Sequence, residues 1–205
     1  MGRTFDLTTP PPMTLEYDGR EYKLIPWFDN VLMMLRAIDG LDAVDRADVM
    51  CAFLVDGECP YDDAGFAAAL MAAFFDARES DGMPRAMDFE QDAALIYSAF
   101  RQAYGIDLHA EIGRMHWLTF LALLEGLPGE TRFSDVVSIR VRPLPDPTKT
   151  NAKERAELMR LKQKYAVRVS EDERQSGLQS GLRKIAECLL ALAEEGDENG
   201  ESRKR

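Results

Sequence analysis

The two histidines are the side chains of this chain best suited to proton transfer or metal binding near neutral pH. His109 and His116 lie seven residues apart, which is two turns of a helix, so they could share one face. Two ligands are too few for a metal site, and neither histidine stands at a ligand spacing from a cysteine. We therefore interpret both as structural and expect His116, beside Trp117, to be buried and hydrogen-bonded. No metal or other cofactor is predicted.

A cluster of carboxylates, Asp88, Glu90 and Asp92, could supply acid–base chemistry, because like charges held close together separate their pKa values. The same residue types are also typical of a helix N-terminus, where they cap free N–H groups and oppose the helix dipole. We favour the helix start, with Gln91 three residues after Asp88 at the spacing of a capping box.

The cysteines offer a further nucleophile, but none has a recognisable catalytic setting. Cys51, Cys59 and Cys188 are odd in number and lack paired spacing, which favours reduced thiols in a cytoplasm. Cys51 would need a nearby histidine to be activated. The chain also lacks a nucleophile elbow, a phosphate-binding glycine loop and a zinc motif. The sequence therefore predicts a protein that is not an enzyme.

The elements that must position these residues are mostly helices. A small β-hairpin is predicted over 15–24, where Asp18-Gly19 suits a type I′ turn and Leu15, Tyr17, Tyr22 and Leu24 share one face. Apolar periodicity predicts five helices: from Pro26 to about 38, at 42–55, from Asp62 or Asp63 to about 75, at 88–104 and at 110–125. A shorter segment at 133–141 has helical spacing but is rich in β-branched residues, which favour strands. The segment 110–125 is apolar on nearly every side, which is typical of a central helix.

The expected fold is mainly α: a compact multi-helix domain with one small N-terminal β-hairpin and a C-terminal helical extension. We expect a flexible lead at 1–13, a core domain at 14–142, a proline-rich linker at 143–150 and a basic helix at 151–168, capped by Asn151. A heptad-like helix is expected at 171–195 and a disordered tail at 196–205.

Charge is unevenly distributed along this chain of net charge −11. Residues 1–141 carry 11 Lys and Arg against 24 Asp and Glu, whereas residues 142–169 carry 8 against 3. An acidic body disfavours nucleic acid as a partner, because phosphate contacts need clustered cations. The basic helix is the exception. More often such a run is a solvated face or docks on acidic protein, and this protein's own acidic body is available.

Two surfaces are therefore candidate partner-binding sites. The cations of the basic helix are Lys153, Arg155, Arg160, Lys162 and Lys164. The apolar seam of the last helix consists of Leu178, Leu182, Ile185 and Leu189, continued by Leu192; it makes a weak coiled coil by itself but hints at a homo-oligomer. Of the ten methionines, we expect one or two on an adaptable binding surface and the rest in the core.

Membrane association is not expected. The longest uncharged apolar run, Ala64 to Phe75, is shorter than the roughly 18 residues that span a bilayer. The first 13 residues contain Asp6 and three consecutive prolines, so they do not form a secretory signal.

Several motifs together resemble a known phage family. These are DFEQD at 88–92, YGIDL at 104–108, His116-Trp117 with Phe120, ALLEGL at 122–127 and LKQKYA at 161–166; the hairpin around Asp18-Gly19 and the following Trp27-Phe28 also fit. In these the chain resembles the bacteriophage Gp-fifteen family over about residues 14–168. It departs from the usual pattern at its ends, residues 1–13 and 170–205.

The resemblance implies a function that composition does not. Members of that family are typically encoded in the tail gene block of siphophages and prophages, before the tape measure gene, and such genes are read as tail assembly chaperones. It implies a non-catalytic factor of the bacterial host cytoplasm that binds apolar helical segments of the phage tape measure protein, with the major tail protein as a further partner. Two alternatives stay open: a tail-completion or connector protein of the virion, and a nucleic-acid-binding regulator acting through the basic helix.

Overall fold

The computed structural model describes residues 7–41, 43–61, 63–75 and 86–168. The chain divides into two units, Met1–Ala166 and Val167–Arg205. All elements described below belong to the first unit. The predicted helix at 171–195 and tail at 196–205 lie outside the described residues.

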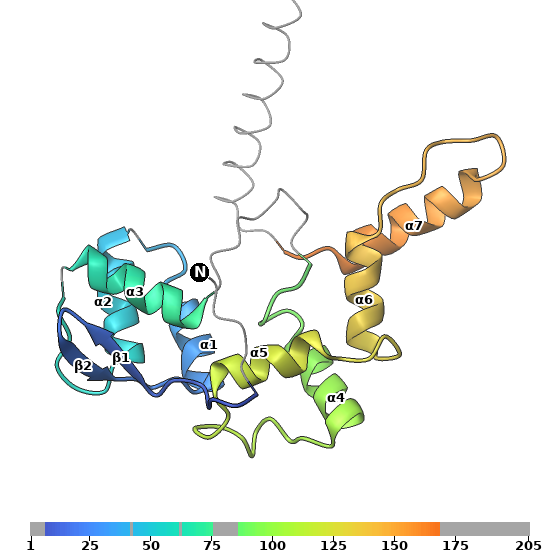
Figure 1. Cartoon of the computed structure of the whole chain (residues 1–205). Helices are drawn as coiled ribbons and strands as arrows, with labels where there is room; N and C mark the ends of the chain where they lie inside the picture. The colour runs from blue at the N-terminus through green and yellow to red at the C-terminus, as the bar shows by residue number, and fades with distance from the viewer. Residues whose placement is uncertain (1–6, 42, 62, 76–85, 169–205) are drawn as a thin grey trace, which may run out of the picture. The chain divides into compact units, whose positions relative to one another are not determined.

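A β-hairpin opens the fold, as predicted (Figure 1). Strands β1 (Thr14–Tyr17) and β2 (Arg20–Lys23) pair antiparallel, with Leu15 opposite Tyr22. Asp18 and Gly19 have φ values of 48° and 70°, which confirms the type I′ turn. The expected apolar face is also confirmed, because Leu15 is buried and the rings of Tyr17 and Tyr22 contact Phe66.

Three helices follow the hairpin and support it. They are α1 (Phe28–Ala37), α2 (Ala43–Leu54) and α3 (Ala64–Phe74). Helix α2 packs on α1 and on α3, and α3 also packs on β1. Asp63 caps α3 by accepting the N–H groups of Gly65 and Phe66, and it also accepts the Tyr17 hydroxyl at 3.1 Å. The buried face of α3 consists of Phe66, Leu70 and Phe74, as the sequence predicted.

Helix α1 begins two residues later than the sequence predicted, because Trp27 is extended rather than helical. Its φ and ψ are −72° and 139°, and it forms an isolated β-bridge with His116. The preceding Pro26 is buried, and its carbonyl accepts the N–H of Trp117 at 2.7 Å. The segment predicted as a first helical turn therefore pairs with a distant part of the chain.

Helix α4 (Ala93–Tyr104) begins after the predicted start at Asp88. Asp88 caps a separate turn, since its Oδ1 accepts the N–H groups of Glu90 and Gln91 at 2.9 and 2.8 Å. The Asp88 N–H, which a capping box would pair with Gln91, donates to Asp92 Oδ2 at 3.0 Å, and the Gln91 side chain donates to the carbonyl of Ala166 at 2.9 Å. At the other end, Gly105 with a φ of 70° ends the helix in the left-handed conformation, as expected.

Helix α5 (Trp117–Glu125) is shorter than the predicted 110–125 helix. Residues 108–114 form turns, and Gly113 has a φ of 66°, which no right-handed helix contains. His116 is extended and caps the helix through its side chain. The central position expected for this helix is confirmed, since α5 packs on both α1 and α4 and Phe120 lies within an aromatic cluster.

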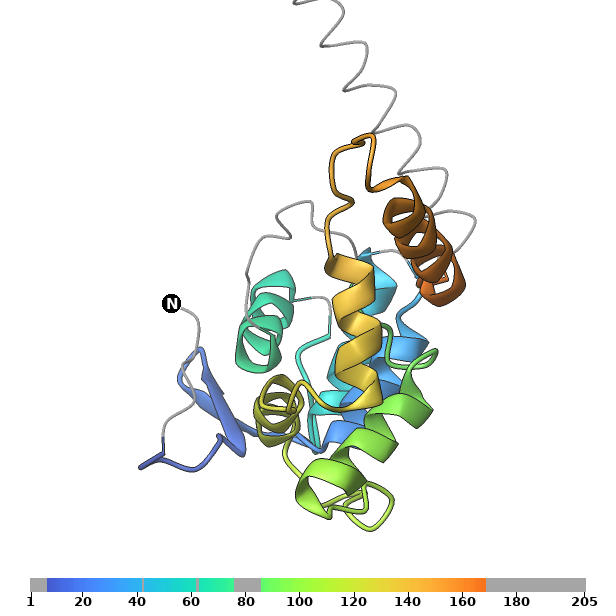
Figure 2. The same ribbon diagram turned by 90° about the vertical axis from the view of Figure 1, so that its right-hand side faces the viewer.

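The last two described helices are α6 (Arg132–Val141) and α7 (Ala152–Tyr165). They lie side by side in both views (Figures 1 and 2), and α6 also packs on α4. The described residues between these two helices contain no regular element. Asn151 does not cap α7 with its side chain as predicted, because its amide instead joins Thr148 N–H and Asp146 carbonyl across the linker. Within the described residues, the fold is thus mainly α, with seven helices and one hairpin.

Candidate partner-binding groove

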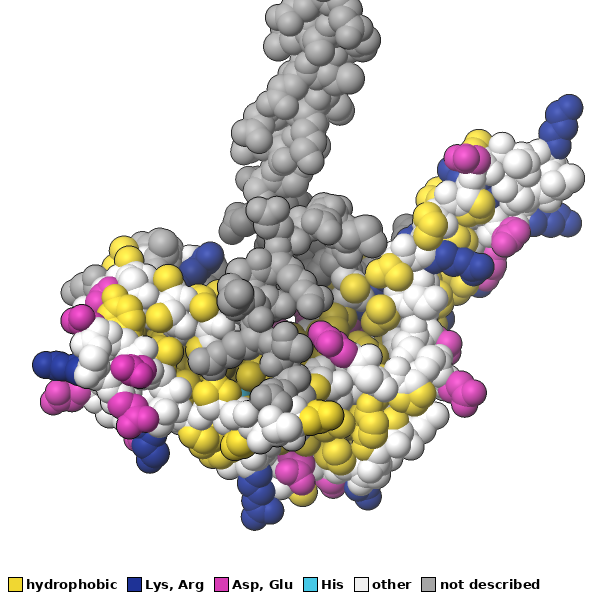
Figure 3. All heavy atoms as spheres, viewed as in Figure 1, with side chains coloured by type: hydrophobic (Ala, Val, Ile, Leu, Met, Phe, Trp, Pro, Cys, Tyr) yellow, Lys and Arg dark blue, Asp and Glu magenta, His cyan; other side chains and the backbone are white. Residues whose placement is uncertain are grey.

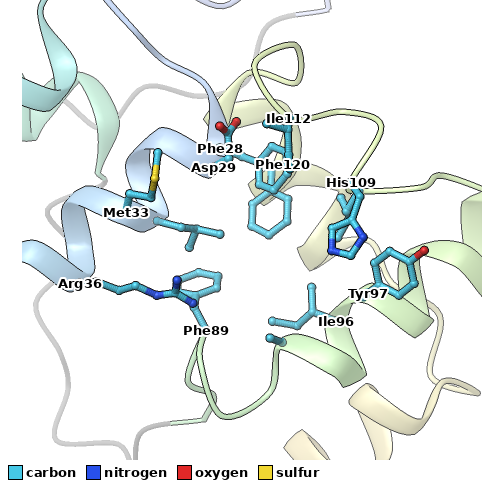
Figure 4. A pocket seen from close by; sticks show the side chains of 13 residues that line it. Phe28, Asp29, Met33, Arg36, Phe89, Ile96, Tyr97, His109, Ile112 and Phe120 are labelled. Carbon is cyan, nitrogen blue, oxygen red and sulfur yellow. The ribbon is translucent and has the colours of Figure 1, made fainter.

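An open apolar groove of about 290 Å³ lies between α1 and α4 (Figure 4). Its floor is formed by Phe28 and Phe120, and its far end is closed by the turns that connect α4 to α5. Within the described residues, α1 and α4 each pack on α5 rather than closely on each other.

The wall formed by α1 combines an exposed methionine with two charged residues. Asp29, Met33 and Arg36 are spaced four and three residues apart, so they follow one face of the helix. Met33 is 47% exposed. Arg36 pairs with Glu90 at 2.5 Å, and Asp29 Oδ1 accepts the N–H of Gly113 at 2.9 Å.

The opposite wall is formed by α4 and the turns that follow it. Ile96 is buried, and Tyr97 lies one residue further along the same helix. The Tyr97 hydroxyl donates to Asp107 Oδ1 at 3.2 Å, and its ring lies 4.9 Å from the ring of His109. Ile112 is 54% exposed, so both walls present a large apolar side chain to solvent.

Stacked aromatic rings make the floor rigid. Phe120 is 1% exposed, and its ring stacks on Phe28 at 5.1 Å and on Phe100 at 5.3 Å. Phe89, from the turn before α4, lies 6.2 Å from the Phe120 ring and 5.7 Å from Trp117. The indole N–H of Trp117 donates to the Phe74 carbonyl at 2.9 Å, which ties this cluster to the end of α3.

A buried ion pair holds the turn that carries Phe89. Arg140 of α6 donates to both oxygens of Asp92, at 2.5 and 2.8 Å, and each side chain is at most 5% exposed. Arg140 also donates to the carbonyls of Tyr165 and Ala86. Burial raises the pKa of Asp92, but the hydrogen bonds from Arg140 and from the Asp88 N–H outweigh it and leave the pKa lowered.

The three clustered carboxylates thus have separate structural partners. Asp88 closes a turn, Glu90 pairs with Arg36, and Asp92 pairs with Arg140. This arrangement departs from the predicted helix cap.

His116 is hydrogen-bonded, as predicted, but it is half-buried rather than buried. Its Nδ1 accepts the N–H of Leu118 at 3.0 Å, so the proton resides on Nε2, which donates to the Pro12 carbonyl at 3.1 Å. Burial lowers the pKa of His116, and the contact with Pro12 opposes that change only in part. His109 is exposed on the groove rim, so the two histidines have different environments.

The thiols of Cys51 and Cys59 are poor nucleophiles. Burial raises the pKa of both, that of Cys59 to about 12, so the reactive thiolate is scarce near neutral pH. Both cysteines are free. Cys188 lies outside the described residues.

The predicted basic residues lie along α7, and several already have partners. Lys162 donates to the Arg140 carbonyl at 2.5 Å, Arg155 donates to the Pro145 carbonyl, and Arg160 pairs with Glu157 at 2.8 Å. Lys164 lies 5.0 Å from the centre of the Tyr165 ring. Lys153 is exposed. The predicted seam residues Leu178, Leu182, Ile185 and Leu189 lie outside the described part of the chain.

In the part of the chain that the structure describes, no three His, Cys, Asp or Glu side chains are gathered as a metal site. None of the described helices has the length and apolarity to cross a bilayer.

Comparison with known protein families identifies the family of this chain. Residues 8–167 match the family described as "Bacteriophage Gp15 protein", which covers most of the chain. The chain belongs to the bacteriophage Gp15 family. The match spans the hairpin, the groove and α7, so all described elements lie within the matched residues. No curated protein and no solved structure gives a significant match. Membership of the Gp15 family indicates a protein of phage particles or of their assembly.

The groove itself was not predicted from the sequence. Sequence reasoning placed one or two methionines on a binding surface without saying which, and that expectation stays a prediction. Met33 is a methionine that lines the groove. The available signal was the spacing of Asp29, Met33 and Arg36, which places a methionine between two charged residues on one helix face.

Proposed function

We propose that this Gp15-family protein assists phage tail assembly by binding apolar helical segments of the tape measure protein in the host cytoplasm. The observation that carries the proposal is the open apolar groove between α1 and α4. The step from phage assembly to the tape measure protein rests on the family resemblance and on the chemistry of the groove.

The shape of the groove suits a helix better than a small molecule. Its volume of about 290 Å³ lies just below the range for small-molecule sites, roughly 300–1,000 Å³, and the groove is open to solvent. An amphipathic helix can place side chains spaced three and four residues apart into such a gap. The exposed Met33 and Ile112 would then flank the bound helix, and Met adapts readily to different partners.

The charge of the protein fits a role in keeping a partner dispersed. Residues 1–141 carry 24 acidic against 11 basic side chains. A complex that covers an apolar stripe with this acidic body would repel other complexes of the same kind. Exposed apolar stripes otherwise associate with one another.

Co-expression with the cognate tape measure protein tests the proposal. We expect the wild-type protein to raise the soluble yield of the tape measure protein several-fold. Met33→Asp and Ile112→Asp should abolish that gain, because each introduces a charge beside the apolar floor while changing an exposed side chain. Met71→Asp, which changes a 42% exposed methionine on α3 away from the groove, is the matched control and should act like wild type.

Two results would contradict the proposal. One is an unchanged soluble yield with the wild-type protein. The other is equal activity of the groove variants and the Met71→Asp control, which would move the binding surface elsewhere.

A further inference from the structure

Helix α7 has an exposed apolar stripe on the side away from α6. Ala152, Ala156 and Met159 are spaced four and three residues apart, so they follow one helix face, and all three are exposed. Met159 is 52% exposed, whereas Leu158, which faces α6, is buried. The stripe therefore consists of one long side chain that follows two small ones.

Cations flank this stripe on both edges. Lys153 and Arg160 are seven residues apart and lie on one edge, and Arg155 and Lys162 lie in the same way on the other. Dark-blue Lys and Arg side chains stand beside yellow hydrophobic ones on this part of the molecule (Figure 3). Lys153 and Arg160 are exposed, and the pair of Arg160 with Glu157 is a surface pair.

The groove between α1 and α4 has the opposite charge. Asp29 lines it, and Asp107 borders it through its contact with Tyr97. Their hydrogen-bond donors within the described residues are neutral: the N–H of Gly113 for Asp29, and the Tyr97 hydroxyl and His109 N–H for Asp107. Arg36 on the same rim is neutralised by Glu90 at 2.5 Å. The rim therefore favours a cationic partner.

The apolar stripe of α7 is compatible with this groove. A cavity of about 290 Å³ has room for a long apolar side chain together with neighbouring parts of the same helix, and methionine adapts to an irregular outline. Alanines one and two turns before that side chain let the two helix backbones approach closely. Met159, with Ala152 and Ala156, meets both requirements.

We propose that α7 of one copy of the protein docks into the groove of a second copy, with Met159 inserted between α1 and α4. The contact is intermolecular, because α7 is held on its own α6 by Leu158, by the Lys162 contact with the Arg140 carbonyl and by Arg140 itself. The interface is head-to-tail: the donor face and the acceptor face are different surfaces, so each copy can use both at once.

This inference goes beyond the proposed function and does not depend on the tape measure protein. It also implies regulation, because the docked helix covers the apolar groove until another helix displaces it. One 14-residue helix buries less than a standard interface, so we expect dissociation constants between about 1 µM and about 1 mM.

Sedimentation of the full-length protein tests the inference without any partner present. Wild type should associate as its concentration rises from about 10 µM to about 500 µM, and high salt should weaken the association by screening the flanking charges. Met33→Asp, which blocks the groove, and Met159→Asp, which blocks the donor helix, should each be monomeric. Met71→Asp should behave as wild type. Circular dichroism checks that all variants fold.

An equimolar mixture of Met33→Asp and Met159→Asp provides the decisive measurement. The first variant keeps an intact α7 and the second keeps an intact groove, so one productive interface is restored. We expect a heterodimer that grows no further. The inference is overturned if wild type stays monomeric over the whole range, if the mixture stays monomeric while wild type associates, or if both single variants still associate. The last result would assign association to another surface, such as residues 171–195.

Discussion

At the scale of single residues, the buried pair of Asp92 and Arg140 is the most consequential contact. It joins the turn before α4 to α6, and through the Tyr165 carbonyl it also reaches the end of α7. A buried pair does not by itself guarantee stability, because desolvating two charges costs as much as their attraction returns. Its importance lies in what happens when one partner is removed.

Arg140→Met is expected to destabilise the fold by about 3–5 kcal/mol, because Asp92 would remain as an uncompensated buried charge. Urea unfolding monitored by circular dichroism measures the change in the free energy of unfolding. The matched control is Arg160→Met, which removes an arginine from an exposed ion pair and should leave the midpoint nearly unchanged. Equal changes in the free energy of unfolding would show that losing the buried pair costs no more than losing the exposed one.

At the scale of elements, the sequence predicted which segments are helical better than where they begin. The apolar spacing of Phe66, Leu70 and Phe74 identified α3 correctly, because local periodicity and the Asp63 cap agree. The starts of α1 and α5 were predicted too early, because Trp27 and His116 pair with each other across almost 90 residues of chain. A bridge between residues so far apart produces no periodicity in the neighbouring sequence from which it could be predicted.

The groove could not be predicted from the sequence for a related reason. Its walls come from α1 and α4, which are far apart in the sequence, and its floor residue Phe120 looks like any other core residue. Periodicity reports that a helix has an apolar face, but it does not report whether a neighbouring helix covers that face.

The cap of α5 makes stability depend on pH. Burial lowers the pKa of His116 below its ordinary value of 6.5, so below that pH the unfolded chain binds more protons than the folded one. The contribution of His116 is therefore complete above about pH 6.5 and is lost as the pH falls. Protonation of Nδ1 also removes the acceptor of the Leu118 N–H.

We expect His116→Asn to flatten this dependence, because asparagine can still cap α5 but does not titrate. Urea unfolding of both proteins at several pH values from about 7.5 to about 5 gives the comparison. His109 and all carboxylates are present in both proteins, so their contributions cancel. Parallel pH profiles would show that His116 is not the responsible group.

At the scale of the whole molecule, the chain combines an acidic body with a basic helix, and its family indicates a protein of phage particles or of their assembly. A chaperone and a virion connector can share this architecture, so composition cannot separate them. Their fates differ, because an assembly factor must leave the tail as the tube closes around the tape measure protein, which calls for moderate affinity.

Mass spectrometry of purified phage particles separates the two roles. If the proposed function holds, the protein is abundant in the lysate of infected cells and absent from particles, while the major tail protein in the same sample serves as a positive control. A fixed number of copies in each particle would instead establish the connector role.

The order in which the groove residues leave the ribosome has a consequence of its own. Translation delivers the α1 wall first, the α4 wall some sixty residues later and the Phe120 floor last. A nascent chain therefore exposes the apolar side of α1 before the rest of the groove has been made, and the groove is incomplete until that phenylalanine emerges. Gene fragments that stop before it should yield insoluble products, and the cell cannot obtain a smaller working version by truncation at that point.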